Sequence, residues 1–410
     1  MSNVSIKPTP TASPAGLSAT LVLALGTFAV GTDAFVVAGF LPPMAEDLGT
    51  TTATAGWSVT VFAAAYAVLS PVLATLLARL PRRTVLIAAL AVLGLANLGS
   101  ALAPSMAALL ATRVLAAAGA ASYTPNAGAA AASLVRPGQR ARALAVVVGG
   151  LTVATAVGVP LGNAASHWSS WRTALATVAG LCLLVAAVLS LVMPPVPGSP
   201  RVPLRTRLAV LRRPAVLTVL PLTVLGMAAG YVAYAYSVPV LTAVHVPEHS
   251  VLWMLLLYGL GAVAGNLASG WATDRFGSSA VLTAGYAVMT LALGGLAWLA
   301  RLAADTDVTD VADTEAVPLV GLLVLLWGAG CWCQTPPQQH RLIEVAPQEA
   351  PLVVSLNSSG IYAGIGLGSV LGGATLGSGA GAVYGLAAGL SALALLFLRV
   401  SLRWSRPKGS

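Results

Sequence analysis

Long apolar stretches alternate with short polar ones along almost the whole chain. Each apolar stretch is close to the roughly 20 residues that an α-helix needs to cross a bilayer. The pattern therefore predicts an all-α membrane protein with twelve transmembrane helices. We place them at residues 17–42, 53–78, 84–103, 106–132, 143–166, 172–194, 214–241, 250–273, 279–303, 316–342, 350–376 and 378–399.

A polar stretch divides these helices into two sets of six. It runs from Pro194 to Arg213 and holds five prolines and five arginines, which is typical of a linker. We predict pseudo-symmetric six-helix bundles at 17–194 and 214–399, joined by a cytoplasmic linker at 195–213. The ends are then a disordered N-terminus at 1–16 and a tail at 400–410, both cytoplasmic.

The composition supports a membrane protein, and the charge distribution orients it. The chain is 57% hydrophobic and 8% charged, whereas soluble domains carry about 25% charged residues. With the N-terminus in the cytoplasm, all of the 21 Lys and Arg residues except Arg113, Arg172 and Arg301 fall on the cytoplasmic side. This bias predicts two cytoplasmic termini. The net charge of +9 then faces anionic lipid, and we expect no nucleic-acid binding.

Asp33 is the only carboxylate that falls inside a predicted span, since the other eleven acids fall in loops. An ionisable group at membrane depth costs at least about 2.5 kcal/mol, so it is rarely there without a function. Arg113 is a second embedded charge at a comparable predicted depth, and pairing would lower the cost of both. The alternatives are that Asp33 reaches water near the outer end of its helix, and that Arg113 anchors backbone carbonyls.

A carboxylate that pairs with an arginine is a candidate for proton coupling. The arginine favours the charged carboxylate, and loss of water favours the neutral one. A conformational change that breaks the pair or dries the site would therefore change the affinity of the carboxylate for a proton. Proton antiport requires such a change, so we predict that Asp33 and Arg113 form the coupling site.

A weak internal repeat relates residues 74–86 to residues 270–282, close to half a chain apart. Repeats of this kind are a mark of secondary transporters, whose substrate site lies between the halves. The second copy resembles the loop signature of the major facilitator superfamily. Its motif residues are Gly270, Asp274, Arg275 and Gly277.

The first copy of the repeat has Ala78 where the superfamily usually has the acid, but it keeps Arg79, Arg82 and Arg83. The resemblance implies that these loops form a charged latch at the cytoplasmic ends of the helices, with the first latch altered by Ala78. The alternative is that both loops only supply positive charge for orientation.

Other stretches resemble the twelve-span drug:proton antiporter branch, in particular its chloramphenicol- and arabinose-efflux-like members. One is the end of the first span, from Gly31 to Pro42, although many relatives carry the acid one position later. Another is the fifth span, with Gly158, Pro160 and Gly162. The resemblance implies that these three residues lie at the interface between the halves. The alternative is tight helix packing, which transmembrane glycines commonly support.

Aromatic and amide side chains inside the spans are candidates for a substrate site. Polar amides in spans tend to face an interior or a cavity, and an aromatic cavity suits a neutral or cationic amphipathic ligand. Any single aromatic residue is otherwise an interface anchor or a packing residue. The predicted substrate-binding residues are Tyr66, Tyr123, Asn126, Tyr231, Tyr234, Gln334 and Asn357.

These features together predict a monomeric proton-coupled exporter of small lipophilic compounds, including phenicol-type antibiotics, in the cytoplasmic membrane of a bacterium. Alternatives are an exporter of sugars or an endogenous metabolite, and a facilitator that is not coupled to protons. An enzyme is disfavoured because no second intramembrane acid and no His–carboxylate pair is available. A channel is disfavoured because only one acid is embedded. We expect no metal and no cofactor, with the proton as coupling ion.

Overall fold

The computed structural model describes residues 14–136, 139–198, 205, 209, 214–244, 246–305, 316–345 and 350–404. Within these ranges the secondary structure is helical, and twelve segments are long and apolar enough to cross a membrane. They coincide with the twelve predicted spans, which confirms the fold class. Most of the predicted N-terminal segment, linker and tail lies outside the described residues.

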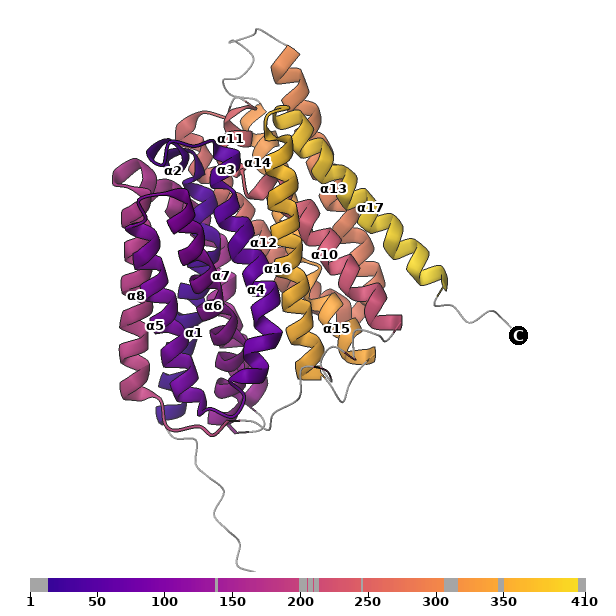
Figure 1. Ribbon diagram of the computed structural model, residues 1–410. Helices are drawn as coiled ribbons and strands as arrows, with labels where there is room; N and C mark the ends of the chain where they lie inside the picture. The colour runs from indigo at the N-terminus through magenta and orange to yellow at the C-terminus, as the bar shows by residue number, and fades with distance from the viewer. Residues whose placement is uncertain are drawn as a thin grey trace, which may run out of the picture.

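Each half of the chain contributes six spanning segments and some short helices (Figure 1). In the first half these are α1 (Pro14–Val36), η1 (Val37–Gly39), α2 (Leu41–Asp47), α3 (Thr52–Ala55), α4 (Trp57–Leu76), α5 (Arg82–Ala101), α6 (Met106–Leu134), α7 (Arg140–Trp168) and α8 (Trp171–Val192). In the second half they are α10 (Pro214–Tyr234), α11 (Ser237–Thr242), α12 (Glu248–Phe276), α13 (Ser278–Asp305), α14 (Ala316–Trp332), α15 (Thr335–Val345), α16 (Ala350–Leu376) and α17 (Ala380–Trp404).

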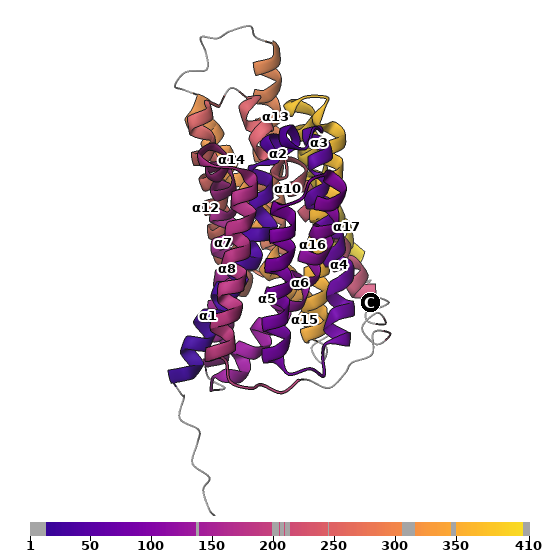
Figure 2. The ribbon, with the colours of Figure 1, turned by 60° about the vertical axis from the view of Figure 1, so that its left-hand side comes forward.

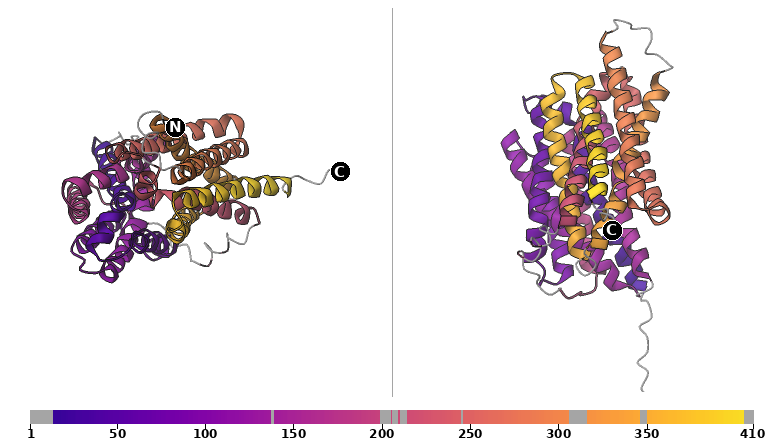
Figure 3. Two further views of the ribbon diagram at one scale, coloured as in Figure 1. Left: turned by 90° about the horizontal axis from the view of Figure 1, so that it is seen from above. Right: turned by 90° about the vertical axis from the view of Figure 1, so that its right-hand side faces the viewer.

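The two halves repeat one packing pattern. In the first, the first span packs on the fifth (α1 on α7), the second on the fourth (α4 on α6), and the third on the sixth (α5 on α8). The second half repeats these three contacts as α10 on α16, α12 on α14, and α13 on α17. Seen from above, the halves form two adjacent helix groups (Figure 3). This is the relation that the weak sequence repeat predicts.

Local sequence explains where several helices begin and break. Ser105 and Ser170 cap α6 and α8, each accepting a hydrogen bond from a backbone N–H of the first turn. The tenth predicted span is two helices, α14 and α15, which meet at Cys333 and Gln334. Two prolines follow in the first turn of α15, where a missing N–H is tolerated.

The glycines of the fifth span pack α7 against α1 in the same half. A Cβ on Gly158 would lie 2.9 Å from Cβ of Phe35, and one on Gly162 would collide with the Val36 carbonyl oxygen. Pro160 lies in α7 between them. The family resemblance placed these residues at the interface between the halves. Their helix does contact α12 of the second half, but Gly158 and Gly162 face α1 of the first bundle.

The two halves meet along two helix pairs, α4 with α16 and α7 with α12. On the first seam Ser369 donates a hydrogen bond of 3.3 Å to the Gly56 carbonyl oxygen, and Gly366 packs against Ala63. On the second seam the backbone of Ala156 lies directly against Gly259. Figure 2 shows α4 and α16 running side by side. Small residues thus let the bundles approach closely.

Candidate functional site: a buried ion pair beside an aromatic seam

A buried ion pair joins α1 to α6. Nη1 of Arg113 lies 2.6 Å from Oδ1 of Asp33, and Nη2 donates a longer hydrogen bond of 3.4 Å to the Asp33 carbonyl oxygen. The Asp33 side chain is 0% exposed and that of Arg113 is 1% exposed. The structure therefore brings together the two charges that the sequence paired, and Asp33 does not reach water here.

The pair is not fully saturated with hydrogen bonds. Within the described residues, Oδ2 of Asp33 and Nε of Arg113 are buried without a partner. The Arg113 guanidinium also lies over the ring of Phe62 on α4, 4.5 Å from its centroid. A cation held against an aromatic face is stabilised electrostatically. Arg113 thus contacts a second helix in addition to its carboxylate.

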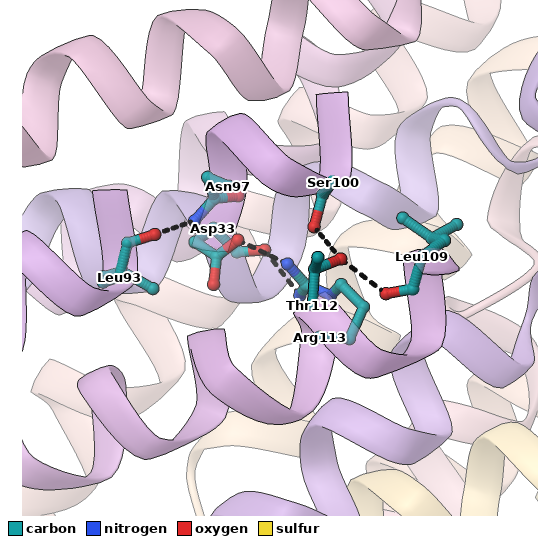
Figure 4. A network of polar contacts seen from close by, with 7 residues as sticks. All are labelled: Asp33, Leu93, Asn97, Ser100, Leu109, Thr112 and Arg113. Atoms are coloured by element: carbon teal, nitrogen blue, oxygen red, sulfur yellow. Dashed lines mark hydrogen bonds and ion pairs between the residues drawn. The ribbon is translucent and has the colours of Figure 1, made fainter. Parts of the chain in front are cut away.

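Asn97 on α5 is a neighbour that the sequence analysis missed. Its Nδ2 donates a hydrogen bond of 3.0 Å to the Leu93 carbonyl oxygen, whereas Oδ1 is buried without a partner among the described residues. Figure 4 places Asn97 beside Asp33, and one turn further Ser100 hydrogen-bonds to Thr112, next to Arg113. A signal existed in the sequence, because Asn97 is a polar amide inside the third span.

Aromatic rings connect the ion pair to the second half. The ring centroid of Phe62 lies 6.5 Å from that of Tyr66 on the same helix and 6.2 Å from that of Tyr362 on α16. Tyr66 and Tyr362 are stacked at 3.7 Å across the seam. The predicted substrate residue Tyr66 is therefore at the contact between the halves, and Tyr362 extends the set from the other side.

A second aromatic cluster lies inside the second half. Tyr231 and Tyr234 of α10, both predicted substrate residues, have ring centroids 5.0 Å apart. The ring centroid of Tyr234 lies 4.4 Å from that of Tyr258 of α12, and the centroids of Tyr258 and Trp327 of α14 are 4.8 Å apart. The Tyr231 hydroxyl and the Trp327 indole N–H have no hydrogen-bond partner within the described chain. The cluster thus offers aromatic faces and unsatisfied donors in one place.

The other two predicted residues of the first half are engaged by their own bundle. The Tyr123 hydroxyl donates a hydrogen bond of 3.1 Å to the Leu23 carbonyl oxygen. Asn126 accepts a hydrogen bond of 3.2 Å from Arg82 and donates one of 2.8 Å to the Ser122 carbonyl oxygen. Both side chains therefore hold helices together in this conformation.

Two predicted amides of the second half are also bonded internally. Gln334, at the break between α14 and α15, donates to the Cys331 carbonyl oxygen at 2.8 Å and accepts from the Tyr286 hydroxyl at 3.0 Å. It thereby satisfies a carbonyl group at the helix break, where the tertiary surroundings must replace lost backbone bonds. Asn357 accepts from the Thr223 hydroxyl at 3.1 Å, and its Nδ2 has no partner in the described residues.

The first-half loop motif is fastened inside its own bundle. Arg82 donates to Asn126 of α6, and the backbone N–H of Arg82 donates to the Val196 carbonyl oxygen at 2.9 Å. Arg83 donates to the Ser190 carbonyl oxygen of α8, while Arg79 is exposed. Neutral oxygen acceptors thus bind the two arginines in this loop, which lacks the acid expected at position 78.

The second-half motif lies at the end of α12. Gly277 ends the helix with φ of +81°, a conformation that glycine adopts without steric cost. Asp274 and Arg275 are exposed, and a Cβ on Gly270 would meet open space. Arg275 lies near the Trp271 and Phe276 rings. No ion pair between this motif and another described residue closes a latch in this conformation.

The sequence profile of the Major Facilitator Superfamily matches residues 23–351 and 223–410. The chain belongs to this superfamily. Among its relatives, the inner membrane transport protein YdhP of Escherichia coli K12 is 30% identical over 386 residues, which cover 93% of this chain and 95% of YdhP. The chloramphenicol resistance protein of Streptomyces lividans is 35% identical over 273 residues, covering 64% of this chain and 69% of that protein.

Solved structures agree with the superfamily fold. A point mutant of the nucleoside transporter NupG matches with a TM-score of 0.71 at 12% identity, covering 94% of this chain and 99% of that one. A bacterial homologue of the lysosomal transporter Spinster matches with a TM-score of 0.68 at 16% identity, covering 96% and 97%. These likenesses support the fold that the sequence profile indicates.

Proposed function

We propose that this transporter is a proton-coupled antiporter that exports small lipophilic or amphipathic compounds, phenicol-type antibiotics among them, by alternating access. The observation that carries the proposal is the fully buried Asp33–Arg113 pair. A buried pair is weak evidence for stability, because desolvation offsets its Coulomb energy. A charged pair next to the seam between two bundles that move during alternating access has a clear use in coupling. The Streptomyces lividans relative supports the substrate class.

The unpaired oxygen of Asp33 gives the proton a place to bind. A proton on Oδ2 would turn that oxygen from an orphan acceptor into a donor. The unpartnered Oδ1 of the neighbouring Asn97 would accept from it once the carboxyl group turns toward Asn97. Protonation also removes the negative charge that holds Arg113. In this scheme Asp33 exchanges an ionic partner for a neutral one, and Arg113 is released.

The aromatic contacts between Phe62, Tyr66 and Tyr362 would couple the release of Arg113 to the second half. Arg113 rests on Phe62, and Phe62 contacts Tyr362 of the second bundle. Release of the guanidinium therefore removes a contact from the ring that touches the opposite half. Interfaces packed in this way switch between discrete arrangements rather than deforming continuously. The proton and the substrate then favour different arrangements of one interface.

The substrate would bind between the stacked pair Tyr66–Tyr362 and the second-half cluster around Tyr231 and Tyr234. Aromatic walls with few polar groups bind apolar ligands, and a few placed donors fix their orientation. The unpartnered Tyr231 hydroxyl and Trp327 indole can donate to carbonyl, nitro or hydroxyl oxygens of such a ligand. No catalytic step is needed, so the protein acts as a transporter and not as an enzyme.

The arginine distribution supports an orientation with both termini in the cytoplasm. We place the protein in the cytoplasmic membrane of a bacterium, as a monomer, with the lipid bilayer and a small-molecule substrate as its partners. Its positive charge serves orientation, and neither nucleic acid nor a metal takes part. A sugar or metabolite exporter uses the same fold, and its substrates would be identified by the same assays.

An experiment in inverted membrane vesicles tests the coupling. With the lumen acidified, adding chloramphenicol should release protons from wild-type vesicles, and Asp33→Asn should abolish this response. Glu46→Gln is the matched control, because Glu46 is an exposed acid just beyond the same span. If the protein is an uncoupled facilitator, the Asp33→Asn variant should transport the drug normally. Drug export by wild type without any pH response would refute the antiport mechanism.

A further inference from the structure

A groove of about 420 Å³ lies in the second half, away from the ion pair and the aromatic clusters. Its volume is within the roughly 300–1,000 Å³ of small-molecule sites. It is formed by α12, α13 and α14, and small apolar side chains dominate its wall. The lining residues are Gly265, Ala268, Ser269, Ala272, Phe276, Ala280, Val281, Ala284, Gly285, Val288, Ala329, Gly330 and Cys333.

The groove is long, and it opens on the outer surface of the bundle. Along α12 it extends from Gly265 to Phe276, which at 1.5 Å per residue is about 16 Å. Ala268 and Ala284, on opposite walls, are both exposed. In a membrane-spanning bundle such a surface faces acyl chains. The length equals one leaflet, since the hydrocarbon core is about 30 Å thick.

Aromatic rings and a cation surround the end of the groove. Trp271 and Phe276 are 64% and 59% exposed and pack edge to face at 6.0 Å. The Arg275 guanidinium lies 6.0 Å from the Trp271 ring and 5.7 Å from the Phe276 ring. Arg275 forms no ion pair within the described chain, and the adjacent Asp274 is about 100° away around the helix. Exposed aromatics beside a cation are typical of a membrane interface.

We infer that this groove binds one acyl chain of an anionic phospholipid in the cytoplasmic leaflet, with the lipid phosphate at Arg275. The assignment to that leaflet rests on the proposed orientation. An apolar channel one leaflet deep fits an acyl chain, and a free cation at its interfacial end complements a phosphate. The wall residue Cys333 follows Trp332, which packs on Phe35 of the first half. A bound chain would therefore lie against the end of α14, which contacts the first half through Trp332.

Native mass spectrometry of the purified protein tests the assignment. The protein is reconstituted with vesicles of phosphatidylcholine containing phosphatidylglycerol, extracted, and analysed for retained lipid. Wild type should retain one phosphatidylglycerol in preference to phosphatidylcholine. Ala268→Trp fills the groove and should abolish retention, while Leu267→Trp on the neighbouring lipid-facing position should not. Ala284→Phe, from the opposite wall, should repeat the loss.

The charge has its own matched control. Arg275→Gln should lower phosphatidylglycerol retention about fivefold, the effect expected of one basic residue at an anionic surface. Arg79→Gln, the exposed counterpart in the first-half loop, should leave retention unchanged. Size-exclusion and melting profiles check that each variant is folded.

Several results would overturn the inference. These are equal retention of phosphatidylcholine, unchanged retention by a folded Ala268→Trp variant, and equal losses in Arg275→Gln and Arg79→Gln. The inference would also be refuted if the groove bound chloramphenicol and neither lipid displaced the bound drug. Retention involves no proton and no transported drug. A failed lipid assay and a failed antiport assay are therefore separate outcomes.

Discussion

Replacing Arg113 by alanine would remove one partner of the buried ion pair and leave the other in place. The change deletes the 2.6 Å ionic contact and the 3.4 Å bond to the Asp33 carbonyl, and leaves a carboxylate with 0% exposure. Removing one member of a buried pair costs about 3–5 kcal/mol, because the remaining charge is uncompensated. We expect Arg113→Ala to lower the melting temperature of the purified protein strongly.

A double variant distinguishes the effect of an unpaired buried charge from the effect of lost side-chain packing. Asp33→Asn combined with Arg113→Met removes both charges and keeps similar volumes. Replacing a buried pair by neutral groups is often neutral for stability. We therefore expect the double variant to melt close to wild type, although it should not couple transport to protons. Thermal melting in detergent, followed for wild type and for the single and double variants, makes the comparison.

The comparison of the single and double variants decides whether charge or packing matters. A double variant that melts as low as Arg113→Ala would refute the reasoning. It would point to Arg113 as a packing anchor on Phe62.

Three further changes test other contacts. Asn97→Leu should slow proton-coupled efflux about tenfold, the value of one hydrogen bond of about 1.4 kcal/mol, without unfolding the protein. Gly56→Ala should impair efflux because its methyl group would collide with the Tyr236 hydroxyl, and adding Tyr236→Phe should restore part of the rate. Arg172→Ala should lower the melting temperature modestly, because it loses a half-exposed ion pair of 2.8 Å to Asp47.

The sequence predicted the number of spans well because apolar length is set by the bilayer. It also paired Asp33 with Arg113, since two isolated charges at one depth have few other partners. Depth is readable from span ends, and the bilayer leaves little freedom in how far along a helix a residue lies. These predictions depend on position along the membrane normal.

The direction of a side chain was less predictable from the sequence. Gln334 is polar and inside a span, as a cavity residue would be, yet it satisfies the carbonyl of Cys331 at a helix break. Gly158 faces α1 rather than the other half. The rotation of each helix is set by packing with several neighbours at once, and hydropathy does not record it. Asn97 was missed for the same reason, because only its position beside Asp33 distinguishes it.

The placement of the ion pair and the aromatic cluster in different bundles has an evolutionary consequence. Asp33 and Arg113 belong to the first half, whereas Tyr231, Tyr234 and their neighbours belong to the second. Under the proposed function, changes within the second-half cluster would alter substrate recognition and leave the Asp33–Arg113 pair of the first half in place. The contact between Phe62 and Tyr362, which lies beside the ion pair, is then one that both halves must keep compatible. Under the same proposal, the second bundle could diverge to accept a different substrate, provided that this contact is preserved.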